Sequence, residues 1–174
     1  MSEFKLPEVN KTLWLAALES GEYKQCTSTL YDSSGYCCLG VFAKGKGAEF
    51  HSVIEEGLDG CGEPFERTAG YYPVLLEPTG RERAIGDNYS GEASHLLDDQ
   101  WGQEEGITPE MQQFFAALND GTTTAEPIAD DDPLFPLYVK YAVSDESSNT
   151  PGYRKFGFVR HTFAEIAEII RTEF

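Results

Sequence analysis

Two adjacent cysteines, Cys37 and Cys38, have the side chains in this sequence best suited to covalent chemistry. A cysteine nucleophile acts as the thiolate, so it needs a neighbouring base and gains from a helix N-terminus, which lowers the thiol pKa. Three histidines are available as that base: His51, His95 and His161. One hypothesis is therefore a cysteine-dependent hydrolase or transferase that uses Cys37 or Cys38 with His161. No histidine has a recognisable spacing to a cysteine, and the alternative is that both thiols are small apolar core residues.

The same residue types are the usual ligands of zinc. The four cysteines are Cys26, Cys37, Cys38 and Cys61, and no two of them are spaced as a zinc knuckle requires. On an extended strand, Cys37 and Cys38 would point to opposite faces. The spacing therefore predicts no zinc site, and it predicts no disulfide between the two adjacent cysteines.

Paired acidic residues are the other candidates for chemistry. Carboxylates bind Mg²⁺ or Ca²⁺, and pairs of them hydrolyse glycosides. None of these pairs lies in an EF-hand loop, and the Gly-rich phosphate-binding motifs are absent, so we predict no metal and no cofactor. We interpret the acidic pairs as exposed binding candidates: Glu55, Glu56, Asp98, Asp99, Glu104, Glu105, Asp130, Asp131 and Asp132.

The net charge of −17 is unevenly distributed. Residues 1–48 are neutral, with five acids and five bases, whereas residues 49–110 hold fifteen acids and three bases, a net charge of −12. Residues 111–174 hold ten acids and five bases, a net charge of −5. Such a field repels nucleic acids and anionic membranes and attracts basic surfaces. The alternative is a solvated acidic surface that only keeps the protein soluble.

One segment near the C-terminus alternates basic and aromatic residues, an arrangement that suits a phosphate-bearing ligand. The alternative is an ordinary strand with one face buried and the other charged. The residues concerned are Tyr153, Arg154, Lys155, Phe156, Phe158, Arg160 and His161.

The first half of the chain predicts one helix and one hairpin. Residues 11–20 form an amphipathic pattern that Asn10 would cap and Gly21 would end. Turn-forming residues at 32–35 lie between 23–31 and 36–42, which favours a β-hairpin; the second arm is either a buried strand or a strand that becomes a buried helix near Cys38. The many glycines of 48–107 favour irregular structure with one or two short strands.

The second half predicts two helices that pack together. Thr108 and Pro109 begin a helix over 109–118, and Thr162 with Glu165 forms a capping box for a helix over 163–174. Between them, 137–143 and 153–161 are predicted strands joined by a Ser/Asn/Pro/Gly-rich loop over 144–152.

Length and composition fit one α+β domain over residues 1–174. A chain of 174 residues with 13% aromatic residues can bury a sizeable core. The first ten residues lack the apolar segment of a secretion signal, and no stretch of 18 or more apolar residues is present. We therefore expect a cytoplasmic protein with reduced thiols and no membrane association.

Three motifs resemble those of a group of small, uncharacterised proteins from bacteriophages and prophage-bearing bacteria. They are an ALxSGxYxQ segment ending at Gln25, the CCLGV segment from Cys37, and a closing pair formed by LND at 118–120 and TFAEIAEII from Thr162. The resemblance implies a phage or prophage source and no particular activity. The group passes almost directly from LND to the last helix, so residues 122–161 are an insertion relative to it.

These observations favour a non-catalytic, acidic accessory protein that binds a basic surface of a host protein in an infected or lysogenic cell. An inhibitor that mimics DNA, or a factor for host takeover or anti-defence, would have this charge and this lack of catalytic motifs. The cysteine-dependent enzyme is the alternative.

Overall fold

The computed structural model describes residues 4–86, 95–124, 126–147 and 150–174. Its helices are α1 (Glu8–Glu19), α2 (Cys38–Gly45), α3 (Asp99–Glu104), α4 (Pro109–Asp120), α5 (Phe135–Tyr141) and α6 (Phe163–Glu173). Its strands are β1 (Tyr31–Asp32), β2 (Gly35–Tyr36), β3 (Glu49–Leu58), β4 (Pro64–Leu76), β5 (Glu82–Ala84), β6 (Ile128–Ala129), β7 (Ser144–Ser147) and β8 (Tyr153–Gly157). They pair antiparallel in the orders β1-β2, β3-β4-β5 and β6-β8-β7. This small α+β domain has the class that the sequence predicts.

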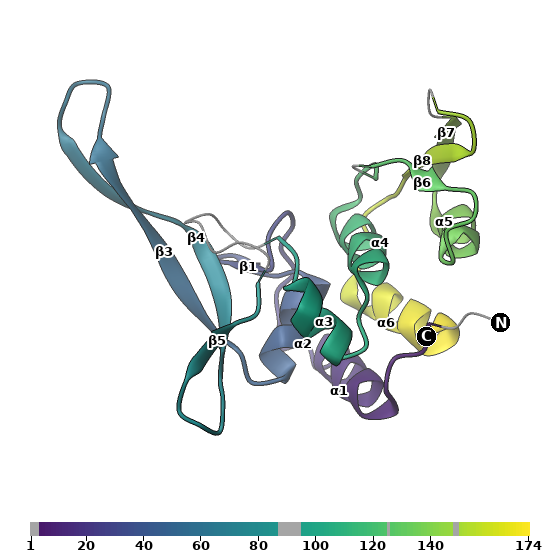
Figure 1. The fold of residues 1–174 in the computed structure, drawn as a ribbon, viewed down its shortest axis with the longest axis horizontal. Helices are drawn as coiled ribbons and strands as arrows, with labels where there is room; N and C mark the ends of the chain where they lie inside the picture. The colour runs from purple at the N-terminus through teal and green to yellow at the C-terminus, as the bar shows by residue number, and fades with distance from the viewer. Residues whose placement is uncertain (1–3, 87–94, 125, 148–149) are drawn as a thin grey trace.

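The core lies where α1, α2, α4 and α6 meet (Figure 1). Trp14 of α1 is fully buried, with its ring centroid 5.2 Å from that of Phe42 and 4.8 Å from that of Phe115. The Trp14 indole N–H donates to the Cys38 carbonyl at 2.8 Å, so its one polar atom is satisfied within the core. Ile166 and Ile170 of α6 belong to the same cluster, which confirms that the α4 and α6 helices share one core.

The local signals for α4 and α6 are confirmed. The Thr108 hydroxyl accepts from the Met111 N–H, and Gly121 ends α4 in the left-handed conformation at φ 65°. Thr162 and Glu165 form the predicted capping box at the start of α6. Both helices begin at a residue whose side chain satisfies a free backbone N–H, which is why the sequence identified them.

The predicted cap of α1 is wrong. The helix begins after Pro7, and Asn10 lies inside it, buried. The Asn10 side-chain amide donates to the Glu105 carbonyl and carboxylate, at 2.8 and 2.9 Å, so it joins α1 to the end of α3 instead. Gly21 does adopt the left-handed conformation past the helix end, at φ 73°.

The predicted hairpin at 23–42 is shorter than expected. β1 and β2 pair across the turn at 32–35, and Gln25 forms one parallel bridge with Tyr36. The second arm becomes α2 from Cys38 onward. This decides between the two alternatives for the apolar segment. Gly40 is required here, because a Cβ at this position would lie 1.8 Å from the Leu30 carbonyl oxygen.

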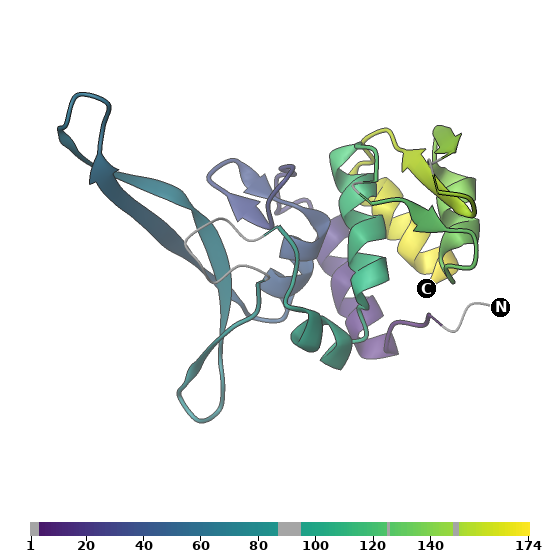
Figure 2. The same ribbon diagram turned by 45° about the horizontal axis from the view of Figure 1, so that its top comes forward.

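The described residues of 48–107, which exclude 87–94, are more regular than predicted. β3 and β4 form a long antiparallel ribbon that projects from the helices, which Figures 1 and 2 show from two directions. A change of register between Val53 and Ile54 divides the ribbon. Its base is held by aromatic contacts: the Phe50 ring lies 5.0 Å from Tyr31 and 5.5 Å from Tyr36. We call residues 54–68, beyond this register change, the arm.

The predicted strand at 137–143 is a helix. Phe135–Tyr141 forms α5, with Pro136 in its first turn, and Tyr138 is buried against Phe114 and Phe156. β8 pairs instead with β6 and with β7, and β7 lies in the predicted loop 144–152. Residues 148–149 of that loop are outside the described residues.

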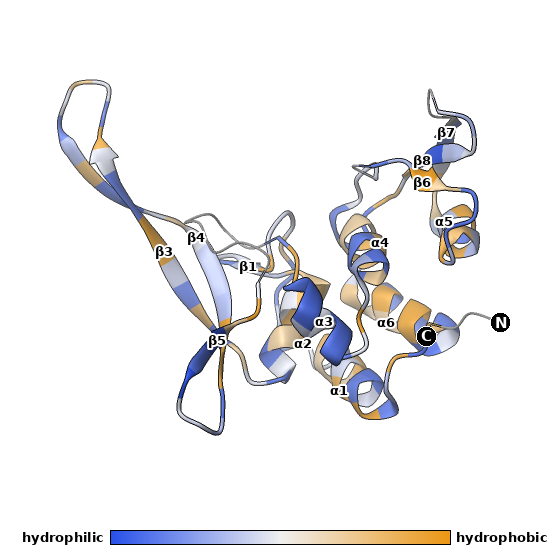
Figure 3. Cartoon of the chain, viewed as in Figure 1, coloured by the Kyte–Doolittle hydropathy of each residue, from blue (hydrophilic) through white to orange (hydrophobic). Residues whose placement is uncertain are grey.

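The predicted strand 153–161 ends early, at Gly157. Residues 122–161, as far as they are described, thus form β6, α5, β7 and β8 rather than a simple hairpin. Figure 3 shows that α3 is mostly hydrophilic and that polar and apolar residues are interspersed along β3. Within the described part of the chain, no helix is long and apolar enough to span a bilayer.

Candidate functional site

The two adjacent cysteines are core residues. Cys37 caps α2: its Sγ accepts from the Gly40 N–H at 3.3 Å, the helix N-terminal position that a nucleophile would use. Desolvation outweighs this hydrogen bond and raises the pKa of Cys37 to about 12. Burial also raises the pKa of Cys38 well above its ordinary value, and its Sγ donates to the Phe115 carbonyl at 3.5 Å.

Within the described residues, no hydrogen bond joins the ring of His161, the base proposed for a cysteine enzyme, to Cys37 or Cys38. The His161 ring Nδ1 lies 2.9 Å from the Val159 carbonyl oxygen. Cys37 and Cys38 are free thiols, both buried, which confirms that they do not form a disulfide with each other. The geometry therefore gives no support to the cysteine-dependent alternative, because a neutral buried thiol is a poor nucleophile.

Asn119 connects the motifs of the family resemblance. Its Oδ1 accepts from the Gln25 amide at 3.0 Å and from the Cys38 N–H at 3.1 Å. Its Nδ2 donates to the Cys26 carbonyl at 2.9 Å and to Asp120 Oδ1 at 2.8 Å. The LND, YxQ and CCLGV segments are thus held together by one fully buried amide.

Asp120 and Gln25 extend this network to the surface. Asp120 Oδ2 accepts from the N–H of Ser28, whose φ of 65° is unusual for a residue with a side chain. The Gln25 amide also donates to the His161 carbonyl at 2.7 Å, while Arg160 donates to the Gln25 carbonyl at 3.0 Å. The network therefore fixes the segment after α1 against the segment before α6.

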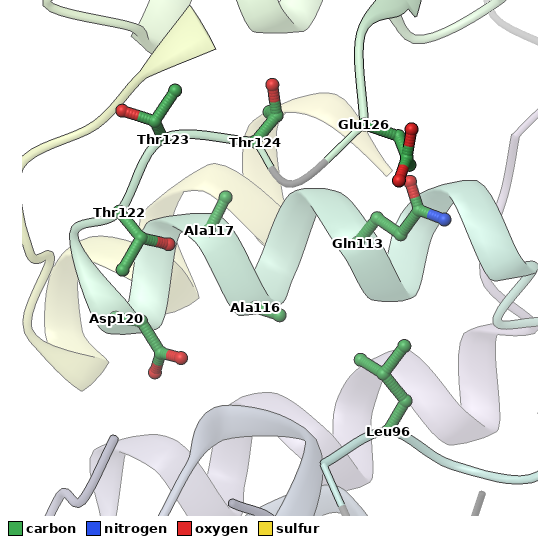
Figure 4. Close-up of a pocket in the computed structure, with 9 residues that line it drawn as sticks. All are labelled: Leu96, Gln113, Ala116, Ala117, Asp120, Thr122, Thr123, Thr124 and Glu126. Carbon is green, nitrogen blue, oxygen red and sulfur yellow. The ribbon is translucent and has the colours of Figure 1, made fainter. Parts of the chain in front are cut away.

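A pocket of about 260 Å³ adjoins the network (Figure 4). Ala116, Ala117 and Leu96 form its apolar wall, and the carboxylates are those of Asp120 and Glu126. Threonine hydroxyls and an amide complete the lining, from Thr122, Thr123, Thr124 and Gln113. Its described lining contains no cationic side chain, so it favours neutral or cationic groups over anions.

The acidic candidates of the arm lie on opposite faces of the ribbon. Glu55 forms an ion pair with Arg67 at 2.7 Å, and the Arg67 guanidinium lies over the Phe65 ring, 5.5 Å from its centroid. On the other face, Glu56 is directly across from Glu66 in the strand register. The one base of the arm, Arg67, lies on the face of Glu55, so the negative charges of Glu56 and Glu66 are not compensated within the arm and repel each other.

Apolar side chains flank that acidic pair. Ile54 and Leu58 are 46% and 68% exposed, and the alternation of a strand places both on the face of Glu56. The hollow between Glu56–Leu58 and Pro64–Glu66 has a volume of about 560 Å³. Ile54, Leu58 and Glu66 are not among the candidates predicted from the sequence. The Asp-Gly sequence at 59–60 was a hairpin signal that would have indicated the two strands on which they lie.

The acidic residues of α3 have structural partners. Asp98 caps α3 by accepting from the Trp101 N–H at 2.9 Å, and Asp99 follows it at the exposed first position. Glu104 pairs with Arg83 and Glu105 with Lys46, each at 2.7 Å. Three of these four carboxylates thus stabilise the domain.

The third acidic group lies at the opposite end of the molecule from the arm (Figure 1). Asp130 is 3.4 Å from Arg154. Asp131 is exposed, and Asp132 accepts from the Leu134 N–H at 2.7 Å while burial raises its pKa. The nine acidic candidates therefore occupy three separate places and form no single surface.

The basic and aromatic segment at 153–161 is a structural strand and its extension. Phe156 and Phe158 are buried, and Arg154 pairs with both Asp130 and Asp145. This matches the alternative of one buried and one charged face. Among the described residues, no group of three or more His, Cys, Asp or Glu side chains is placed to hold a metal ion.

Comparison with known proteins gives one partial match. A family described as a domain of unknown function (DUF8296) matches residues 7–57, which include α1, α2 and most of β3. No curated protein and no solved structure matches the chain. The match contains the first two motifs of the resemblance, and LND lies outside it.

Proposed function

We propose that this protein is a non-catalytic binding protein whose arm attaches to a basic surface of a host protein. The single observation that carries the proposal is the arm itself, a projecting ribbon with five acidic residues and one base, Arg67. Its net charge of −4 lies on a two-stranded structure with solvent on both faces. Such a ribbon gains little stability by itself and is well placed to reach a partner.

The phage or prophage source implied by the sequence motifs belongs to the same proposal. A phage protein of this kind would act in the cytoplasm of an infected or lysogenic cell, as an inhibitor, a DNA mimic or an anti-defence factor. The acidity supports this class of action, because the natural ligand of many basic protein surfaces is the phosphate backbone. The buried thiols support a non-catalytic role.

The proposal is tested by capture followed by direct binding. The immobilised full chain is exposed to a bacterial lysate at low salt, and each retained protein is purified and titrated against it by calorimetry. We expect a basic protein whose affinity falls at least about tenfold when Glu56 and Glu66 are changed to Lys, since rim charges of opposite sign attract. Duplex DNA should compete for the same protein.

A matched control changes two exposed acids outside the arm, Glu22→Lys and Asp131→Lys. This variant has the same net charge as the arm variant and should bind within about twofold of the wild type. Equal losses in both variants, or retention of acidic and neutral proteins only, would overturn the proposal.

A further inference from the structure

We infer that the free edge of β3 in the arm is a strand-addition site for a basic segment of the partner. This inference rests on the proposed function and specifies its geometry. The segment would lie alongside Ile54, Glu56 and Leu58 as a further strand of the ribbon. Its side chains would alternate as apolar, any residue, Lys or Arg, any residue, apolar.

The backbone of β3 supplies the first part of the argument. In the order β3-β4-β5, β3 is an edge strand, and in the described residues β4 alone pairs with it. An edge strand presents a row of backbone N–H and C=O groups that can pair with another chain. β4 is less suitable, because Pro64 and Pro73 lack an N–H and Arg67 repels a basic segment.

The side chains of β3 supply the second part. A strand added to β3 places its residues directly opposite Ile54, Glu56 and Leu58. A Lys or Arg opposite Glu56 would pair with the Glu56 carboxylate, which would relieve the repulsion between Glu56 and Glu66 across the two strands of the arm. Apolar residues two positions away on either side would cover Ile54 and Leu58, which are otherwise exposed.

The same charges disfavour a second copy of this chain as the occupant. Antiparallel pairing of two β3 edges centred on Glu56 would put Glu56 opposite Glu56. Two arms of net charge −4 would also approach each other. Charge complementarity therefore selects a basic partner, and self-association becomes an outcome of the test.

The test uses a synthetic peptide of about nine residues with the central segment Val-Ser-Arg-Ser-Val, which places the Arg between the two Val side chains on one face. Its binding to the full chain is measured by fluorescence anisotropy. A second peptide has the same sequence with N-methyl groups on consecutive backbone nitrogens of the central segment, which removes the N–H donors from both of its edges. We expect the N-methylated peptide to bind at least about tenfold more weakly. Hydrogen exchange should show new protection in 54–58.

Variants locate the site on the arm. Glu56→Gln and Leu58→Ser should each weaken peptide binding about fivefold or more, whereas the control Asp131→Asn should change it less than about twofold. Circular dichroism checks that each variant is folded. Equal binding of the two peptides, equal effects of all three variants, or no peptide binding at all would overturn strand addition. None of these results overturns the proposed function, which the captured protein tests separately.

Light scattering decides the remaining alternative. The free chain should be monomeric at low salt, since arm-to-arm pairing opposes like charges. A dimer that Glu56→Gln strengthens and Leu58→Ser breaks would show that the occupant is a second copy, and it would overturn the inference.

Discussion

At the scale of single residues, one buried amide decides how three distant segments meet. Asn119 uses both its oxygen and its nitrogen twice, toward Gln25, Cys38, Cys26 and Asp120. An asparagine fits because the site needs an acceptor on one side and a donor on the other. From the sequence, Asn119 could be placed at the end of a helix, but its four partners could not be predicted, because the tertiary structure brings them together.

Asn119→Asp should therefore lower the free energy of unfolding by about 2–4 kcal/mol, since it turns the donor into an acceptor that faces the Cys26 carbonyl and the Asp120 carboxylate. Chemical denaturation measures this loss. The control Gln113→Ala, exposed on the same helix, should cost less than about 0.5 kcal/mol. Similar values for the two variants would contradict the network described here.

The thiols give a second residue-scale prediction. At about pH 8, iodoacetamide should label exposed Cys61 rapidly and leave Cys37 and Cys38 unlabelled until denaturant is added. The raised pKa of Cys37 has a consequence for stability: the folded state keeps the proton between pH 9.0 and about 12, while the unfolded state releases it. The contribution of the protonated Cys37 thiol to the free energy of unfolding is therefore fully present below pH 9.0, and it is lost as the pH rises from 9.0 to about 12. Rapid native labelling of Cys37 would revive the enzyme alternative.

At the scale of elements, the helices that were predicted from the sequence have capping residues at their N-termini and a stripe of buried apolar side chains. α4 and α6 combine caps with apolar residues at helical spacing. The ribbon of β3 and β4 lacked a buried stripe, because its outer residues have solvent on both faces, so the Asp-Gly turn was its main signal in the sequence. α5 was mistaken for a strand because a segment of seven residues, rich in aromatic and branched side chains, suits either structure.

The packing of α6 is tested by Ile166→Ala, which should lower the free energy of unfolding by about 2–5 kcal/mol through the cavity it leaves. Ile166 is fully buried in the core shared with α4. Glu168→Ala, on the exposed side of the same helix, removes an ion pair with Arg171 and should cost less than about 1 kcal/mol. A loss below about half a kcal/mol for Ile166→Ala would mean that this stripe is not packed as described.

At the scale of the whole molecule, part of the unpaired negative charge lies on the arm, away from the helical core. Acidic side chains of the helical body form ion pairs within the chain, Glu104 with Arg83 and Glu105 with Lys46. The arm instead extends its acidic residues away from the body, whereas the base of the ribbon is held by the contacts of Phe50 with Tyr31 and Tyr36. The sequence predicted a negative region at 49–110 from its composition. It could not predict that part of this charge lies on a projecting ribbon.

The salt dependence of association is the most direct measurement of this account. The rate constant for binding of the captured basic protein is measured by stopped flow from about 20 to about 300 mM salt, a range in which the screening length falls to several Å. We predict that the association rate constant falls at least about tenfold, that the dissociation rate constant changes far less, and that Glu56→Lys with Glu66→Lys removes most of the salt dependence. An association rate constant that is indifferent to salt, or that the arm variant leaves unchanged, would contradict an electrostatic role for the arm.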